Sequence, residues 1–246
     1  EMKSVDRMGL LKMDFLGLIT LTILDDAVRT ASKRTGSPID LAKIPLNDPE
    51  VFRLFSEGRT DGIFQFESSG MRDLLRRVQP SVFEDLAALN ALYRPGALDA
   101  GTVEVYIERR RGRKFDYPLP QLEPILRDTY GVLVYQEQVM LAARAVAGYT
   151  PGEADKLRKA IGKKDENLLK EQGDKFVNKS VEKGVPKKKA EELWELILPF
   201  GRYGFNKSHS VVYALLAYRT AWMKVHHPVD FMAATLPPGV RRTLSA

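Results

Sequence analysis

Two residues near the start of the chain, Lys12 and Asp14, have types and spacing suited to phosphate chemistry. They lie in residues 10–16, where apolar and polar side chains alternate. In a β-strand this alternation places Lys12 and Asp14 on one face, about 6.6 Å apart along the chain. A fixed carboxylate beside an amine suits metal-assisted phosphoryl transfer, with Asp14 holding Mg²⁺ and Lys12 meeting phosphate. An ordinary ion pair on an edge strand explains the same two residues, and one carboxylate does not complete a two-metal site.

A second group of candidate residues belongs to a helix expected over 151–161. One side of this helix is apolar, whereas Arg158 and Lys159 lie on the other side and Lys163 follows at its exit. A helix that is buried on one side and basic on the other can bind phosphate groups. A solvated helix face accounts for the same pattern equally well.

The third candidate is the segment 203–210, which precedes a long apolar helix. It combines aromatic, amide, cationic and hydroxyl groups at a helix N-terminus, where backbone N–H groups attract anions. Its spacing differs from that of a glycine-rich phosphate loop. One interpretation is structural, with Asn206 or Ser208 capping the helix. The other is ligand contact by Asn206, Lys207 and His209.

Composition excludes several classes of protein. The 246 residues carry 38 Lys+Arg against 32 Asp+Glu, a net charge of +6, and 44% are hydrophobic, as in a soluble globular protein. The chain has no cysteine, which excludes disulfide scaffolds, iron–sulfur clusters and cysteine zinc sites. No apolar run is long enough to span a membrane. We therefore expect a cytoplasmic protein with no membrane partner.

The elements that must position these residues are mainly α-helices, because most of the chain has helical periodicity with marked helix ends. Asp48 before Pro49 is expected to cap one short helix, and a capping box formed by Ser81 and Glu84 to start another. Thr150 is expected to cap the helix that Gly162 closes. The other helices are predicted over 20–35, 69–78, 102–111, 135–147, 166–182, 187–198, 209–225 and 228–236.

The strand predicted over residues 10–16 has no convincing partner later in the chain. A lone strand is not stable by itself, so its sheet must come from elsewhere. The fold expected is therefore a multi-helix domain preceded by a short strand segment, as a piece of a larger protein.

Five motifs occur in one order along the chain. They are Gly9-Leu10-Leu11-Lys12-Met13-Asp14-Phe15-Leu16-Gly17-Leu18, Phe64-Gln65-Phe66-Glu67-Ser68-Ser69-Gly70-Met71, Tyr93-Arg94-Pro95-Gly96, Tyr130-Gly131 with Tyr135-Gln136-Glu137-Gln138, and Gly204-Phe205-Asn206-Lys207-Ser208-His209. Together they resemble the alpha subunit of bacterial DNA polymerase III, the family C replicative polymerases, over about residues 8–236. This resemblance implies that 1–19 end the palm with its last catalytic strand and that 20–236 form the fingers domain. Residues 237–246 depart from the family pattern and are expected to be a disordered or non-native tail.

The resemblance also implies roles for the candidate residues. Asp14 would be the third of three catalytic carboxylates and a Mg²⁺ ligand, and Lys12 a phosphate contact. The family usually has two adjacent arginines where this chain has Arg158 and Lys159. Lysine keeps the charge but lacks the bidentate fork of arginine, so the role carries over more directly onto Arg158. The residues implied to lie at the triphosphate of the incoming dNTP are Lys12, Arg158, Lys159, Lys163, Asn206, Lys207 and His209.

The function implied is Mg²⁺-dependent, template-directed nucleotidyl transfer in DNA replication. Its partners would be dNTP, primer–template DNA, the palm and thumb of the same subunit, and replisome subunits that bind regions absent from this chain. The chain alone would be inactive, because it holds one of the three catalytic carboxylates. A different class of function fits the basic helices as well: a non-catalytic helical module that binds nucleic acid or a protein partner.

Overall fold

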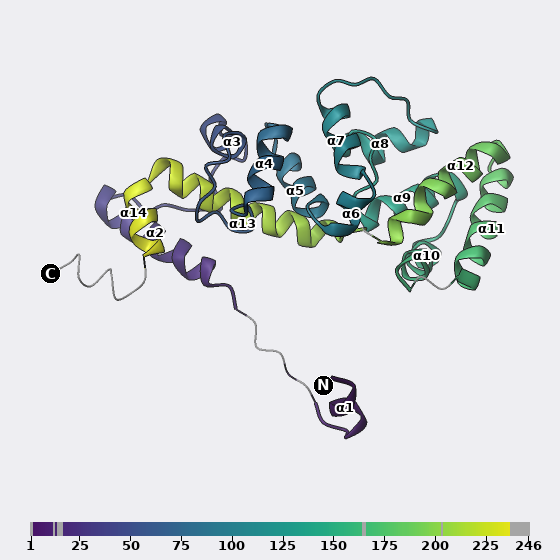
Figure 1. The fold of residues 1–246 in the computed structure, drawn as a ribbon, viewed down its shortest axis with the longest axis horizontal. Helices are drawn as coiled ribbons and strands as arrows, with labels where there is room; N and C mark the ends of the chain where they lie inside the picture. Colours follow the sequence, from purple (N-terminus) through teal and green to yellow (C-terminus); the bar gives the residue numbers. More distant parts are fainter. Residues whose placement is uncertain (1, 12, 14–16, 164–165, 203, 237–246) are drawn as a thin grey trace.

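The computed structural model is an elongated assembly of helices (Figure 1) and describes residues 2–11, 13, 17–163, 166–202 and 204–236. Over these residues no β-strand occurs beyond a single bridge between Tyr135 and Phe205. The mainly helical fold predicted from the sequence is confirmed. The α-helices are α1 Met2–Arg7, α2 Ile19–Thr35, α3 Pro49–Ser56, α4 Ser69–Val78, α5 Phe83–Leu92, α6 Pro95–Asp99, α7 Thr102–Arg110, α8 Glu123–Leu126, α9 Gln136–Ala147, α10 Pro151–Lys163, α11 Glu166–Glu182, α12 Lys187–Ile197, α13 Lys207–His226 and α14 Pro228–Thr235. Short 3₁₀ turns are η1 Pro120–Leu122, η2 Arg127–Thr129 and η3 Leu198–Arg202.

Several helix ends form as the sequence predicts. Asp48 accepts a hydrogen bond from the backbone N–H of Glu50 at 2.9 Å and so caps α3. At α10, Thr150 and Glu153 form a reciprocal capping box: each backbone N–H donates to the other side chain, at 2.9 and 3.3 Å. Helix α2 ends at Gly36 in the left-handed conformation that glycine adopts without strain.

Two predicted helix ends are wrong. Helix α5 has no capping box between Ser81 and Glu84; instead the carboxylate of Asp85 accepts from the backbone N–H groups of Ser81 and Val82, at 3.0 and 3.3 Å. Asp85 faces the interior, where an arginine fixes its carboxylate in reach of those groups. Gly162 does not close α10, which continues to Lys163 because a glycine can also keep a helical conformation.

The predicted strand lies partly outside the described residues. Lys12 and residues 14–16 are not described, so nothing is concluded about them. Leu11 and Met13, which a strand would turn toward a core, are 84% and 67% exposed, and neither belongs to a strand. The described part of the chain holds no sheet for them to pack on, and a strand over residues 10–16, whose sheet is expected to come from elsewhere, stays a prediction.

The buried side chains form two hydrophobic clusters. The first joins α2–α5 and α7 with α13 and α14, and the second joins α9–α12 with η1. Helix α13 packs against α2, α3, α5 and α14, and it runs as a long rod beneath α3–α5 in Figure 1. The start of α9 lies between the clusters, since Tyr135 is buried in the first and Val139 in the second. No described helix combines the length and the apolar character that crossing a membrane requires.

Candidate functional site

Helix α10 has the two faces that its sequence predicts. Its apolar arc is buried, because Ala154 and Leu157 are 0% exposed and Ala160 and Ile161 only 1% and 4%. Ala154, Leu157 and Ile161 belong to the second cluster, and the helix packs on α9 and α11. The opposite face is therefore turned to solvent, and it carries the basic residues.

Arg158 and Lys159 share one carboxylate on this face. The Nε and Nη2 atoms of Arg158 donate to Oδ1 of Asp155 at 3.0 and 2.8 Å, and Nζ of Lys159 lies 2.7 Å from its Oδ2. These hydrogen bonds, that of Lys159 first, hold the pKa of Asp155 below its ordinary value. The Arg158 and Lys159 side chains remain 32% and 61% exposed. The group carries a net charge of +1 at an accessible surface, which favours an anionic ligand.

The start of α13 holds the other predicted residues. Asn206 caps this helix, because its side-chain oxygen accepts from the backbone N–H of His209 at 2.8 Å. Nζ of Lys207 lies 5.5 Å from the centre of the Tyr135 ring. The exposed His209 ring stacks on Tyr213, with 4.2 Å between the ring centres. The structural interpretation of Asn206 is confirmed, while ligand contact by these residues is not tested.

One side chain connects α10 to the segment before α13. Oε1 of Gln136, the first residue of α9, accepts from Nη1 of Arg158 at 3.4 Å. Its Nε2 donates to the carbonyl oxygen of Gly204 at 3.4 Å. The structure thereby brings Arg158 and Lys159 close to the 204–209 segment. A hollow in this region is lined by Gln136, Val139, Arg158, Ile161, Gly162, Phe200 and Gly204.

The remaining predicted residues are not placed. Lys12 and Asp14 lie outside the described residues, and so does the side chain of Lys163, the last residue of α10. Within the described part of the chain, no group of three or more acidic or histidine side chains could hold a metal ion. The predicted Mg²⁺ site therefore has no support among the residues that the structure describes.

Sequence reasoning missed Gln136 and Glu137 as parts of this site. Both carboxylate oxygens of Glu137 are used: Oε1 accepts from Nδ2 of Asn206 at 3.0 Å and Oε2 from the backbone N–H of Lys207 at 2.9 Å. The sequence contained a signal, because Tyr135-Gln136-Glu137-Gln138 is one of the ordered motifs. Nothing in its spacing indicates that it contacts residues about 70 positions later.

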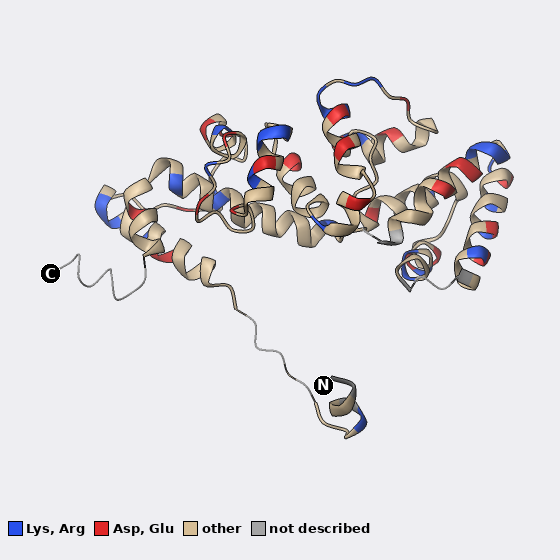
Figure 2. Ribbon diagram, in the orientation of Figure 1, with Lys and Arg blue, Asp and Glu red and all other residues tan. Residues whose placement is uncertain are grey.

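Charges of both signs are interspersed along the described helices (Figure 2). Several arginines outside α10 form ion pairs with acidic side chains. Arg72 pairs with Asp61 and Arg76 with Asp73. This pairing weakens the case for a broad basic face as a binding surface. The cation pair on α10 differs from these arginines because two cations share one acid.

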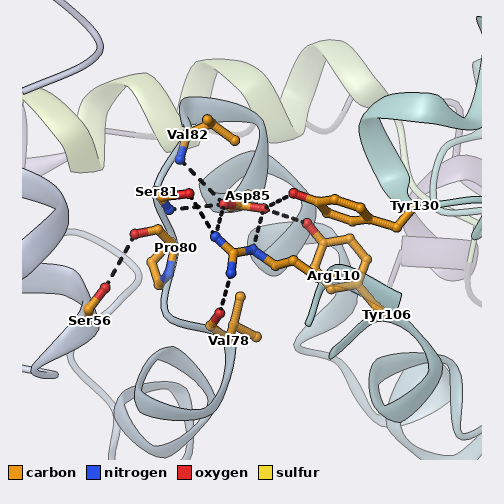
Figure 3. Close-up of polar contacts among 9 residues, drawn as sticks. All are labelled: Ser56, Val78, Pro80, Ser81, Val82, Asp85, Tyr106, Arg110 and Tyr130. Atoms are coloured by element: carbon orange, nitrogen blue, oxygen red, sulfur yellow. Dashed lines mark hydrogen bonds and ion pairs between the residues drawn. The ribbon is translucent and has the colours of Figure 1, made fainter. Parts of the chain in front are cut away.

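A second, buried polar cluster lies between α5, α7 and η2 (Figure 3). Arg110 donates to both carboxylate oxygens of Asp85, at 2.9 and 2.7 Å. The hydroxyl groups of Tyr106 and Tyr130 donate to Oδ1 of Asp85 at 3.0 and 3.2 Å.

Burial alone would raise the pKa of Asp85, but the hydrogen bonds from Arg110 and from the N–H of Ser81 outweigh it and keep that pKa below its ordinary value. Burial, followed by the charge of Asp85, raises the pKa of Tyr130 to about 12. These hydrogen bonds join α5, α7 and η2.

The geometry defines an all-helical module with an accessible cation pair beside the N-terminus of a long helix. Residues 20–184 match the model of the bacterial DNA polymerase III alpha subunit finger domain. The chain therefore belongs to the bacterial DNA polymerase III alpha subunit family, and the resemblance found in its motifs is confirmed.

Similar proteins carry the same description over nearly the whole chain. DNA polymerase III subunit alpha of Aquifex aeolicus is 50% identical over 237 residues, 96% of this chain and 20% of the relative. The protein of that description from Thermus aquaticus is 46% identical over 242 residues, covering 96% of this chain and 20% of the relative. The one from Escherichia coli K12 is 43% identical over 253 residues, covering 99% and 22%. The chain spans about a fifth of the length of these relatives.

Proposed function

We propose that the chain supplies the nucleotide-binding fingers of a replicative, DNA-directed DNA polymerase, in which Arg158 and Lys159 bind the triphosphate of the incoming dNTP. The observation that carries the proposal is their arrangement: two half-exposed cations share Asp155 and lie beside the start of α13. Membership of the alpha subunit family supports it.

The chemistry of the two cations fits this role. During nucleotidyl transfer, negative charge shifts onto the leaving pyrophosphate, and cations fixed beside it stabilise that charge. The guanidinium of Arg158 can bind two phosphate oxygens at once, whereas Lys159 contributes a single point charge. Lys163, Asn206, Lys207 and His209 complete the proposed nucleotide site from the exit of α10 and the first turn of α13.

The proposal extends to the segment before α2. Residues 1–19 would end the palm, with Asp14 giving one of three metal-binding carboxylates and Lys12 meeting phosphate, and residues 20–236 would form the fingers. Mg²⁺ bound by such carboxylates stabilises charge on phosphate oxygens. The other two carboxylates would come from the rest of the subunit, so the chain alone is expected to be inactive. Primer–template DNA, the palm and thumb, and further replisome subunits would be its partners.

Primer extension by the full-length subunit that contains this chain tests the proposal. Replacing Arg158 with alanine should raise KM for dNTP by about tenfold or more, as expected for the loss of a charged hydrogen bond. Arg158→Lys should recover part of the loss, and Asp14→Asn should abolish extension at any dNTP concentration. Arg144→Ala is the matched control, an exposed arginine on α9.

An unchanged KM for dNTP in Arg158→Ala would refute the triphosphate assignment. Full activity in Asp14→Asn would refute the catalytic assignment. DNA binding that needs no metal ion and does not change when dNTP is added would instead support a non-catalytic helical module.

A further inference from the structure

The first two residues of α9 contact both halves of the proposed nucleotide site. Gln136 accepts from Arg158 with its side chain, and its backbone N–H donates to the carbonyl oxygen of Phe205 at 2.8 Å. In return, the N–H of Phe205 donates to the carbonyl oxygen of Val134 at 3.3 Å. Two backbone hydrogen bonds thereby hold Phe205, which precedes α13, against the start of α9. Gln136 makes one of them and also contacts Arg158 on α10.

Glu137 fastens the next two residues of that segment. Its two carboxylate oxygens accept from Asn206 and from the backbone N–H of Lys207. Asn206 caps α13 through its own oxygen, and Glu137 satisfies one more backbone donor of that helix end, the N–H of Lys207, which is its first residue. Its carboxylate also fixes the position of the capping residue relative to α9.

The support beneath these two residues is rigid. Oε1 of Gln138 accepts from the backbone N–H groups of Val134 and Tyr135, both at 2.9 Å, and its Nε2 donates to the hydroxyl of Thr129 at 2.8 Å. Gln138 is 3% exposed and Tyr135 2%. Because the start of α9 is held in this way, Gln136 and Glu137 can transmit a fixed geometry to what they touch.

We propose that Gln136 and Glu137 are positioning residues, which hold Arg158 on α10 and the start of α13 at the separation that one triphosphate needs. The inference rests on the proposed function, because it takes the triphosphate site as given. Neither residue has to touch the nucleotide. A small displacement of groups that bind the reacting phosphates is costly, so anchoring of this kind affects nucleotide use more than overall stability.

The test uses primer extension by the full-length subunit that contains this chain. Glu137→Ala and Gln136→Ala should each raise KM for dNTP by about tenfold, on the scale expected for losing a charged hydrogen bond. The KM for primer–template DNA should stay unchanged. Glu137→Gln, which keeps one acceptor oxygen, should lie between Glu137→Ala and the parent. Arg144→Ala on the same helix serves as the control, with an unchanged KM for dNTP.

A double-mutant cycle separates positioning from general structural support. In a subunit that already carries Arg158→Ala, adding Gln136→Ala should raise KM for dNTP by a smaller factor than it does in the parent, because one of the two groups that Gln136 holds is gone. Equal effects in both backgrounds would refute positioning through Arg158. Melting temperatures within about 2 °C of the parent would show that each variant is folded.

The outcomes distinguish this inference from the function on which it rests. If Arg158→Ala leaves KM for dNTP unchanged, the triphosphate assignment itself fails. If Arg158→Ala raises KM but Gln136→Ala and Glu137→Ala do not, the function stands and the positioning role is wrong. A rise in KM for DNA as large as that for dNTP would also overturn it, because it would indicate a general loss of structure.

Discussion

Two arginine–aspartate pairs in this molecule have the same chemistry and different surroundings. Arg110 and Asp85 are 12% and 1% exposed, and the carboxylate also accepts from two tyrosines and two backbone N–H groups. Arg158 and Asp155 are 32% and 36% exposed, and their other partners are Lys159 and Gln136. A buried pair with every acceptor occupied holds helices together, whereas an accessible pair can exchange its carboxylate for another anion. Burial, not the residue types, separates the pair that holds helices together from the pair proposed to bind an anion.

The largest effect that tests this comparison is on stability. Asp85→Ala should lower the free energy of unfolding by about 3–5 kcal/mol, because it leaves the Arg110 charge buried without its partner. Asp155→Ala should cost less than about 1 kcal/mol, since its ion pairs are half-exposed and screened by water. Urea unfolding of both variants measures the contrast. Equal losses would remove the distinction between the two pairs.

An intermediate effect concerns anion binding. In the proposed site, Asp155 would compete with a phosphate group for Arg158 and Lys159. Asp155→Ala should therefore tighten the binding of dNTP to the chain by about two- to fivefold, the equivalent of up to ~1 kcal/mol. The gain should shrink as salt is added, because exposed charges are screened. Calorimetric titration measures it, with the exposed Asp174→Ala as control. Weaker binding would mean that Asp155 orients the arginine instead of competing for it.

The helices around both pairs could be predicted from sequence because their causes are local. The caps at Asp48 and Thr150 and the apolar arc of α10 depend on residues within one or two turns. The start of α5 was mispredicted for the opposite reason: Asp85 caps it while paired with Arg110, 25 residues later. Local rules contain no information about such partners.

The candidate site, like the helices, could be predicted only in part. The cations of α10 and the residues at the start of α13 were found from their types and from the family resemblance. That Gln136 joins them depends on tertiary contacts across 22 and 68 residues. Lys12 and Asp14 remain predictions, since the described residues do not include them.

The smallest effect should come from a partly exposed ionic cluster that joins α10 to α11. The backbone N–H of Thr150, followed by Lys175 and Lys179, lowers the pKa of Glu153 from 4.5 to about 2. Because the unfolded chain binds this proton more readily, Glu153 contributes its stability above about pH 4.5, and that contribution disappears as the pH falls toward about 2. The difference in unfolding free energy between the parent and Glu153→Gln should therefore be greatest near neutral pH and shrink on acidification. A difference that grows as the pH falls would contradict the depressed pKa of Glu153.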